Sequence, residues 1–330
     1  MSMPSREITY GEAVREAIAE EMRRDNTVFF MGEDVAVAGG VFKVTTGLLD
    51  EFGSERVRDT PISEAGIMGA GVGTAMTGMR PIVEIMFGDF ITIAMDQIVN
   101  QAAKMCYMTG GQAKVPLTVR TTIGAGRSSA AQHSQSLHVW LSHIPGLKVA
   151  IPSTPADLKG LLKTAIRDDN PVIIYEDKMM YSTKGMVPDG EHAIPFGVAD
   201  IKREGRDVTV VAISRMVHTA LAAAELLEKE GISVEVVDPR TLSPLDMETI
   251  LDSVRKTSRA VVIDEAYRSF GITGEIASRI ADEAFDFLDA PVKRLGAMDV
   301  PVPFSPGLEP STIPNEETII KAVHSLFRDV

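Results

Sequence analysis

The stretch that decides the fold is Arg58-Asp59-Thr60-Pro61-Ile62-Ser63-Glu64-Ala65-Gly66, which leads from an extended turn into a run of small residues. Pro61 favours an extended backbone at Thr60, and Ser63 is well suited to cap a helix that begins beside it. Glu64 then falls in the first helical turn, where the helix dipole favours a carboxylate. The small residues allow a backbone or a flat ligand to approach closely; they are Gly66, Gly69, Ala70, Gly71 and Gly73.

Two interpretations of Glu64 follow from these residues. An acid in the first turn commonly does no more than stabilise the helix. Alternatively, the carboxylate serves a ligand that lies against the small residues. The glycines do not form a dinucleotide-binding turn, because Met76 stands where the G-x-G-x-x-G pattern requires its third glycine.

Composition excludes several classes of protein. Lys and Arg number 33 against 46 Asp and Glu, which gives a net charge of −13 and argues against a nucleic-acid partner. No apolar run is long enough for a membrane span. Cys106 is the only cysteine, which excludes a disulfide within the chain and favours a cytoplasmic location.

Short apolar strands alternate with helical patterns along both halves of the chain. We expect first-half strands at 28–32, 81–87, 115–120, 147–151 and 171–175, and helices at 9–24, 45–52, 90–105 and 155–167. We expect second-half strands at 208–213, 233–237, 260–264 and 292–295, and helices at 217–230, 245–256, 273–286 and 315–328. Residues 182–206 are polar and broken by Gly and Pro, which predicts a linker. The pattern predicts an α/β protein with two doubly wound parallel-sheet domains, at residues 1–181 and 207–330.

The motif from Asp59 to Ile67 resembles the cofactor motif of the beta subunits of thiamine-diphosphate-dependent 2-oxo acid dehydrogenases. These subunits belong to the decarboxylating first component of the pyruvate, branched-chain and acetoin dehydrogenase complexes. The likeness covers nearly the whole chain and includes Ala131-Gln-His-Ser-Gln135 and Pro239-Arg-Thr-Leu-Ser-Pro-Leu-Asp246. It implies a pyrimidine-binding domain at residues 1–181 and a domain like the C-terminal domain of transketolase at 207–330.

The resemblance implies catalytic roles for two residues. Glu64 matches the carboxylate that contacts N1′ of the aminopyrimidine of thiamine diphosphate and thereby helps to activate the thiazolium ring. His133 matches an active-site histidine that assists substrate handling or acyl transfer. The residues alone leave open that His133 is a loop histidine bonded to nearby serines. His138 and His143 follow at five-residue steps, but no Cys, Asp or Glu completes a zinc site with them.

Four residues match positions near the cofactor. Phe87 and Phe90 lie where the family places an aromatic ring against the aminopyrimidine, although some relatives carry that ring where this chain has Gly88. Glu33 and Asp96 match acids that line a buried route between two cofactors. The alternatives are core packing for the two phenylalanines, a loop acid for Glu33 and a helix-surface acid for Asp96.

The segment from Ala165 to Pro171 resembles a monovalent-cation loop of relatives that bind potassium. Carbonyl oxygens and one or two polar side chains hold K⁺ there, and the matching positions are Leu117, Ala165, Ile166, Asp168 and Asn170. The alternative is a capped helix end before a strand. The magnesium motif of the class, Gly-Asp-Gly followed by Asn, is missing, since Gly88-Asp89-Phe90 and Pro188-Asp189-Gly190 do not fit it. We therefore expect an alpha subunit, in an α2β2 heterotetramer, to supply the Mg²⁺ ligands.

The resemblance also implies a reaction. It is the cleavage of a small 2-oxo acid such as pyruvate, or of acetoin, with transfer of the acyl unit to lipoyl groups of an acyltransferase core. The segments 86–90 and 136–140 are most similar to acetoin- and pyruvate-type relatives, and 181–185 favours the acetoin branch. The alternatives are a branched-chain 2-oxo acid dehydrogenase subunit, a split transketolase-like subunit and a non-catalytic α/β scaffold.

Overall fold

The computed structural model of the chain describes residues 4–327 and divides into two compact units. Unit 1 contains the residues up to Ile123 together with Trp140–Phe196. Unit 2 contains Gly124–Val139 and the residues from Gly197 onward. The segment Gly124–Val139 therefore follows a strand of unit 1 in the sequence but belongs to unit 2, which a division at a single linker does not anticipate.

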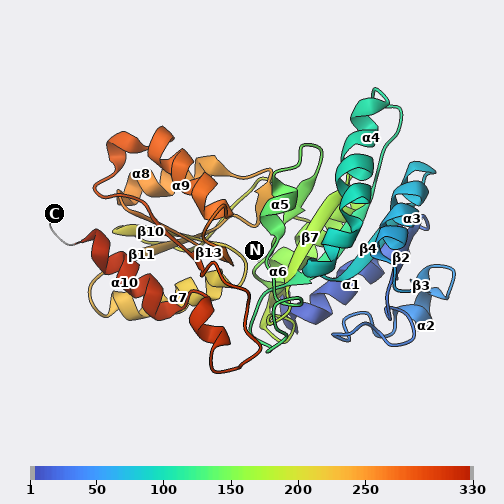
Figure 1. Ribbon diagram of the computed structural model, residues 1–330, viewed down its shortest axis with the longest axis horizontal. Coiled ribbons are helices and arrows are strands. Elements are labelled where there is room, and N and C mark those ends of the chain that lie inside the picture. The colour runs from blue at the N-terminus through green and yellow to red at the C-terminus, as the bar shows by residue number, and fades with distance from the viewer. Residues whose placement is uncertain (1–3, 328–330) are drawn as a thin grey trace. The chain divides into compact units, whose positions relative to one another are not determined.

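Unit 1 is built on a parallel sheet in the order β6-β7-β5-β4-β2-β3. Its strands are β2 (Val28–Gly32), β3 (Val57–Asp59), β4 (Arg80–Phe87), β5 (Thr118–Ile123), β6 (Lys148–Ala150) and β7 (Val172–Asp177). One face carries α1 (Tyr10–Arg24) and α6 (Pro155–Arg167), which pack against each other (Figure 1). A short helix, α2 (Leu48–Phe52), precedes β3, and β1 (Ser5–Thr9) pairs with β8 (Lys184–Pro188).

The opposite face of this sheet carries α3 (Glu64–Met76). A Cβ added at Gly71 would lie 2.8 Å from Val83 and 3.2 Å from Leu117, whereas Ile82 packs in the core with α1 and α6. Because neighbouring residues of a strand point to opposite faces, these contacts place α3 across the sheet from α1. Because Gly71 has no side chain, α3 packs close to β4, and this packing sets the distance of Glu64 from the strands.

Helix starts follow the sequence closely, with two differences. Thr9 forms a capping box with Glu12 at α1, and the Thr154 side chain accepts from the Asp157 N–H at α6. Ser63 occupies the N-cap position of α3, but its side chain makes no capping hydrogen bond. The single helix predicted for 90–105 is wrong in detail, because the segment is a 3₁₀ helix (Gly88–Ala94), a π-helix (Gln97–Ala102) and α4 (Ala103–Met108).

Unit 2 has a sheet in the order β14-β13-β10-β11-β9. Its strands are β9 (Asp200–Arg203), β10 (Val208–Ala212), β11 (Val234–Asp238), β13 (Ala260–Tyr267) and β14 (Lys293–Ala297). All are parallel except β9, which pairs antiparallel with β11 at the edge. The helices α7 (Met216–Glu228) and α10 (Glu316–Leu326) lie on one face, and α8 (Met247–Thr257) and α9 (Ile272–Glu283) on the other (Figure 1).

The predicted α/β class with a parallel sheet in each half is therefore confirmed, with an antiparallel edge strand added in unit 2. The segment 182–206 contains β8 and β9 rather than loop alone. Among residues 4–327, no helix has the length and apolar character needed to cross a bilayer.

Candidate active site

Glu64 lies where two neighbouring strands of unit 1 end. The last residues of β2 and β3, Gly32 and Asp59, are paired, and the Thr60 N–H donates to the Gly32 carbonyl at 2.9 Å. The carboxyl ends of parallel strands are the usual place for ligands in such sheets. Glu64 is 6% exposed at the start of α3, and within residues 4–327 its carboxylate makes no hydrogen bond or ion pair.

Glu33 is brought together with Glu64 at this edge. It directly follows β2, is half-buried, and has an Oε1 atom that is buried without a hydrogen-bond partner in the described part of the chain. Burial raises the pKa of the Glu33 carboxyl, and the nearby charges of Glu64 and Asp34 raise it further. Two carboxyl groups in one site favour the retention of a proton by one of them, which is a common property of functional acids.

A buried ionic network lies in the sheet beside these acids. Arg120 of β5 donates to Glu176 of β7 at 2.9 and 2.6 Å and also pairs with Glu84 of β4. Tyr181 donates its hydroxyl to Glu176 at 2.6 Å. Burial opposes the charge on Arg120, but the two carboxylates raise the pKa of its guanidinium above the ordinary value. The network therefore keeps a fixed cation in the core of unit 1.

The two predicted aromatic residues belong to a cluster. The rings of Phe87 and Phe90 meet edge to face with centroids 5.7 Å apart, and Phe42 meets Phe87 at 5.9 Å. Phe42 in turn lies 5.0 Å from the Tyr181 ring. Phe87 and Phe90 are only half-buried, so the cluster joins the buried network to the molecular surface.

Asp96 occupies a different environment from Glu33. It is exposed, immediately before the π-helix, and its Oδ1 accepts from the Asn100 side chain at 2.8 Å. In the described residues its side chain is exposed on the surface of this helical segment.

His133 lies in unit 2, within the segment Gly124–Val139. The residue is half-buried, and its backbone N–H donates to the Ala130 carbonyl at 3.4 Å. Five residues later, His138 is fully buried and its Nε2 lies 2.8 Å from Oδ2 of Asp264 in β13. His138 thus anchors the end of the segment that carries His133.

The predicted cation ligands gather at the end of α6 and the start of β5. The Leu117 carbonyl accepts from the Val172 N–H at 2.9 Å, and the Ala165 carbonyl accepts from the Asp168 N–H at 3.1 Å. Both oxygens therefore already take part in the backbone structure, although a carbonyl has a second lone pair available.

Two further predicted ligands of this loop, Ile166 and Asp168, are bound by cationic side chains. Nη1 of Arg80 donates to the carbonyls of Ile166 and Asp168, at 3.2 and 2.9 Å. The Asp168 carboxylate pairs with Lys148 and accepts from the Asn170 side chain at 2.9 Å. Burial opposes ionisation of Asp168, but these two donors hold its pKa below the usual value. The loop already contains cations supplied by the chain itself.

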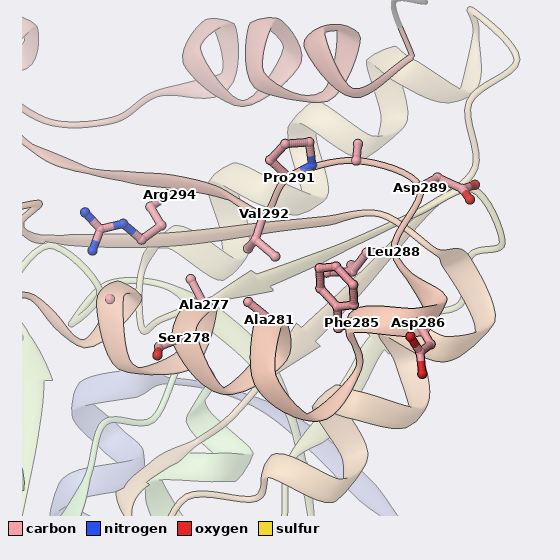
Figure 2. Close-up of a pocket in the computed structure, with 12 residues that line it drawn as sticks. Ala277, Ser278, Ala281, Phe285, Asp286, Leu288, Asp289, Pro291, Val292 and Arg294 are labelled. Atoms are coloured by element: carbon pink, nitrogen blue, oxygen red, sulfur yellow. The ribbon is translucent and has the colours of Figure 1, made fainter. Parts of the chain in front are cut away.

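A hollow of about 890 Å³ lies in unit 2, between α9 and the segment that leads into β14. Figure 2 shows Ala277 and Ala281 of α9 facing Val292, with Phe285 and Leu288 at one end. Its lining is mainly apolar and contains no histidine or glutamate. Its charged lining residues are Asp286, Asp289 and Arg294, and none of the residues predicted for the active site lines it. Among the described residues, no cluster of His, Cys, Asp and Glu could hold a metal ion.

Comparison with known proteins matches both units. The domain described as "Transketolase, pyrimidine binding domain" matches residues 6–184, and "Transketolase, C-terminal domain" matches residues 197–319. The beta subunit of acetoin:2,6-dichlorophenolindophenol oxidoreductase from Bacillus subtilis is 51% identical, over 98% of each chain. The beta subunit of the pyruvate dehydrogenase E1 component from Rickettsia felis is 50% identical, over 96% of this chain and 97% of the relative.

This chain belongs to the beta-subunit family of thiamine-diphosphate-dependent 2-oxo acid dehydrogenases. The beta subunit is also similar to a solved structure titled "Split gene transketolase, inactive beta4 tetramer". The TM-score is 0.78 at 25% identity, and the likeness covers 97% of the beta subunit and 98% of that chain. The fold is therefore that of transketolase over nearly the whole length.

Sequence reasoning missed the ionic network of the beta subunit and the acids that hold the His133 segment. A signal for the network was available, because Glu84 and Arg120 each interrupt an apolar strand, and charged residues are rarely buried unless paired. Glu265 likewise interrupts an apolar strand, β13, but the amides that these acids bind lie 140 residues from Glu265 and 183 and 181 residues from Glu309, so the sequence does not reveal them.

Proposed function

We propose that this chain supplies the pyrimidine-facing half of a thiamine-diphosphate site in a heteromeric dehydrogenase. The observation that carries the proposal is the Glu64 side chain at the start of α3, which is largely buried, makes no hydrogen bond or ion pair within the described residues and lies beside Glu33. Buried polar groups are normally hydrogen-bonded. A pyrimidine nitrogen that can exchange a proton with Glu64 is a suitable partner, and the domain match at residues 6–184 favours that ligand.

Glu64 fits this cofactor because a carboxylate can accept a proton from the N1′ side of the ring and return it. Bound thiamine diphosphate supplies a carbon nucleophile for attack on the substrate carbonyl. Burial, and then the charge of Glu64, raises the pKa of the Glu33 carboxyl. An acid with a raised pKa beside Glu64 suits proton transfer at one ring nitrogen.

We assign the other predicted residues to three tasks. His133 holds or moves a proton on the substrate side, for which an imidazole is suited near neutral pH. Phe87 and Phe90 form an apolar edge for the pyrimidine. Asp96 joins Glu33 on an acidic route to a second cofactor. Because Asp96 is exposed in this chain, this last role requires a partner chain to cover it.

The partner we propose is an alpha subunit in an α2β2 heterotetramer. The chain lacks the Gly-Asp-Gly…Asn motif, and no metal-binding cluster occurs among residues 4–327. The ligands of Mg²⁺, and with them the grip on the diphosphate, are therefore assigned to that partner. Several curated relatives are themselves described as beta subunits of an enzyme or an E1 component.

Potassium remains a proposal for the loop of Leu117, Ala165, Ile166, Asp168 and Asn170. An ion there would have to share or displace Arg80 at two carbonyls. We expect Arg80→Met to increase the gain in Tm that KCl gives the assembled complex over choline chloride at equal ionic strength. An equal gain for wild type and variant would contradict competition with Arg80.

The proposed substrates are acetoin and pyruvate, in that order, with lipoyl groups of an acyltransferase core as acceptor. Relatives of both kinds occur at similar identity, 51% and 48% for two acetoin enzymes and 50% for a pyruvate enzyme. Pockets that differ by one or two methylenes discriminate by only about 1–3 kcal/mol. A cytoplasmic location is proposed on the lone, half-buried Cys106.

The deciding experiment compares the chain alone with the chain reconstituted with its alpha subunit. Acetoin, pyruvate and a branched 2-oxo acid are offered at equal concentration, with an artificial electron acceptor and added thiamine diphosphate and Mg²⁺. We expect turnover only in the complex, and highest with acetoin. Turnover by the chain alone would refute the shared site, and preference for the branched acid would favour the branched-chain alternative. Absence of activity and of cofactor binding in the complex would favour a scaffold.

A further inference from the structure

The segment that carries His133 has an irregular backbone. Gly124 and Gly126 have φ of +97° and +111°, and Ser128 and Ala130 have φ of 52° and 59°. Non-glycine residues in this left-handed region are uncommon and cost free energy unless the surroundings impose them. The backbone N–H groups of such a segment lack the partners that a helix or strand would provide, and they must find others.

Glu309 supplies two of these partners. It lies at the start of a 3₁₀ helix, Glu309–Thr312, and is only 3% exposed. Its Oε1 accepts from the Gly126 N–H at 2.7 Å, and its Oε2 accepts from the Ser128 N–H at 2.9 Å. One carboxylate thus spans both sides of Arg127 and fixes the turn that leads to His133. Charged acceptors make such bonds stronger than neutral ones.

Two further acids fix the ends of the same segment. Glu265, 8% exposed, accepts from the Ala125 N–H at 2.5 Å and pairs with Arg215, whose Nε lies 3.0 Å away. At the other end, Asp264 contacts His138 at 2.8 Å. All of these residues belong to unit 2. The segment is therefore held before and after His133 by carboxylates that contribute nothing else to the predicted active site.

We propose that Glu309, supported by Glu265, is a positioning residue that sets the conformation of the His133 segment. The inference rests on the proposed role of His133 in substrate handling. Glu309 acts through the backbone amides of Gly126 and Ser128 and does not touch the substrate. Removal of the Glu309 carboxylate leaves the imidazole of His133 unchanged but frees the turn that orients His133.

The first test is Glu309→Gln in the reconstituted complex. The amide keeps the size of the side chain but replaces one acceptor with a donor, which cannot accept from a second N–H. We expect kcat to fall roughly tenfold or more, as when a reacting group is misplaced, with cofactor binding unchanged. Glu316→Gln makes the same charge change at an exposed acid of α10 and is expected to leave kcat unchanged.

A double-mutant cycle separates positioning from general stability. In a His133→Ala background, Glu309→Gln should change kcat by less than about twofold, because groups that act as a unit are not additive. If the two substitutions lower kcat by factors that multiply, Glu309 does not act through His133 and the proposal is overturned. Wild-type turnover of His133→Ala alone would overturn the proposed role of His133 and, with it, any positioning role that acts through His133.

Hydrogen–deuterium exchange tests the contacts themselves without any assay of turnover. In Glu309→Gln, exchange of the Gly126 and Ser128 amides should accelerate while the amides of α10 keep their wild-type rates. Unchanged exchange at 126 and 128 would overturn the proposal. Should Glu309→Gln fail to assemble, Glu309→Asp, which withdraws the carboxylate by one methylene, is expected to give the same pattern with a smaller loss.

Discussion

The start of α3 and the His133 segment place their side chains in opposite ways. Glu64 is fixed by residues near it in sequence, through paired strand ends at Gly32 and Asp59 and a helix that begins at Glu64 itself. His133 sits in a segment whose amides are bound by Glu265, 140 residues away, and by Glu309, 183 and 181 residues away. A local motif can therefore reveal Glu64, whereas the setting of His133 depends on contacts formed by the folding of unit 2.

The largest expected effect is at Glu64, the residue that the local motif reveals. Glu64→Gln in the reconstituted complex should lower turnover by about 10²–10⁴-fold, because an amide cannot exchange a proton in the same way. The folded state should be retained, which thermal unfolding can check. Glu55→Gln, at an acid whose side chain is 89% exposed, serves as control. Wild-type turnover of an assembled Glu64→Gln complex would contradict a catalytic role for Glu64, and with it the comparison between Glu64 and the His133 segment.

A second substitution tests whether the ionic network stabilises the sheet that carries Glu64. Arg120→Met leaves Glu84 and Glu176 as unpaired buried acids, which should cost about 3–5 kcal/mol of unfolding free energy. Chemical denaturation of the purified chain provides the measurement. Arg58→Met, which removes an exposed pair with Glu55, should cost no more than about 1 kcal/mol. Similar losses for both variants would mean that the network does not stabilise the sheet.

A smaller effect is expected at the end of the His133 segment. Asp264→Asn weakens the buried contact with His138, which should cost about 1–3 kcal/mol. Amide exchange over Gly124–Val139 should accelerate more than exchange in the strands of unit 1. The control is Asp282→Asn, at an exposed acid of α9. Uniform acceleration over both units would argue that the segment is not a separately anchored element.

The smallest effect concerns Glu33 and depends on pH. The pKa of Glu33 in the folded state is raised, chiefly by burial and then by the charge of Glu64. Protonated Glu33 therefore contributes its full share of the unfolding free energy below the pKa of the unfolded state, and this share is lost as the pH rises through the pKa of the folded state. Glu33→Gln removes this loss. The Tm of the variant relative to wild type should therefore increase as the pH rises above 4.5, the ordinary pKa of a glutamate. A difference that shrinks over this range would contradict a carboxyl that resists ionisation.

Regular patterns allowed most of the fold to be predicted. The strands are short apolar runs, and starts such as Thr154-Pro155 carry a cap and a proline at the first turn. The segment 90–105 was harder, because apolar spacing does not distinguish an α-helix from the 3₁₀ and π turns found there. Strands β8 and β9 escaped notice because glycine, proline and polar residues near them are typical of loops.

The candidate site was only partly predictable, for a physical reason. Glu33 follows a predicted strand, but β3, which precedes Glu64, was not predicted, and it is the parallel pairing of β2 with β3 that brings the two acids together. Glu309 stands in a loop between prolines and glycine, and its sequence neighbours say nothing of the amides of Gly126 and Ser128. Contacts of this range become visible only when the tertiary structure is known.

The chain passes between its two units at 123/124, 139/140 and 196/197, and this path limits how such genes can recombine. A chimera that joins residues 1–196 of one relative to 197–330 of another takes its histidine segment from one parent and Glu265 and Glu309 from the other. An exchange that keeps each parent's contacts together moves residues 124–139 with the carboxyl-terminal half, although more than fifty residues of unit 1 lie between the two pieces.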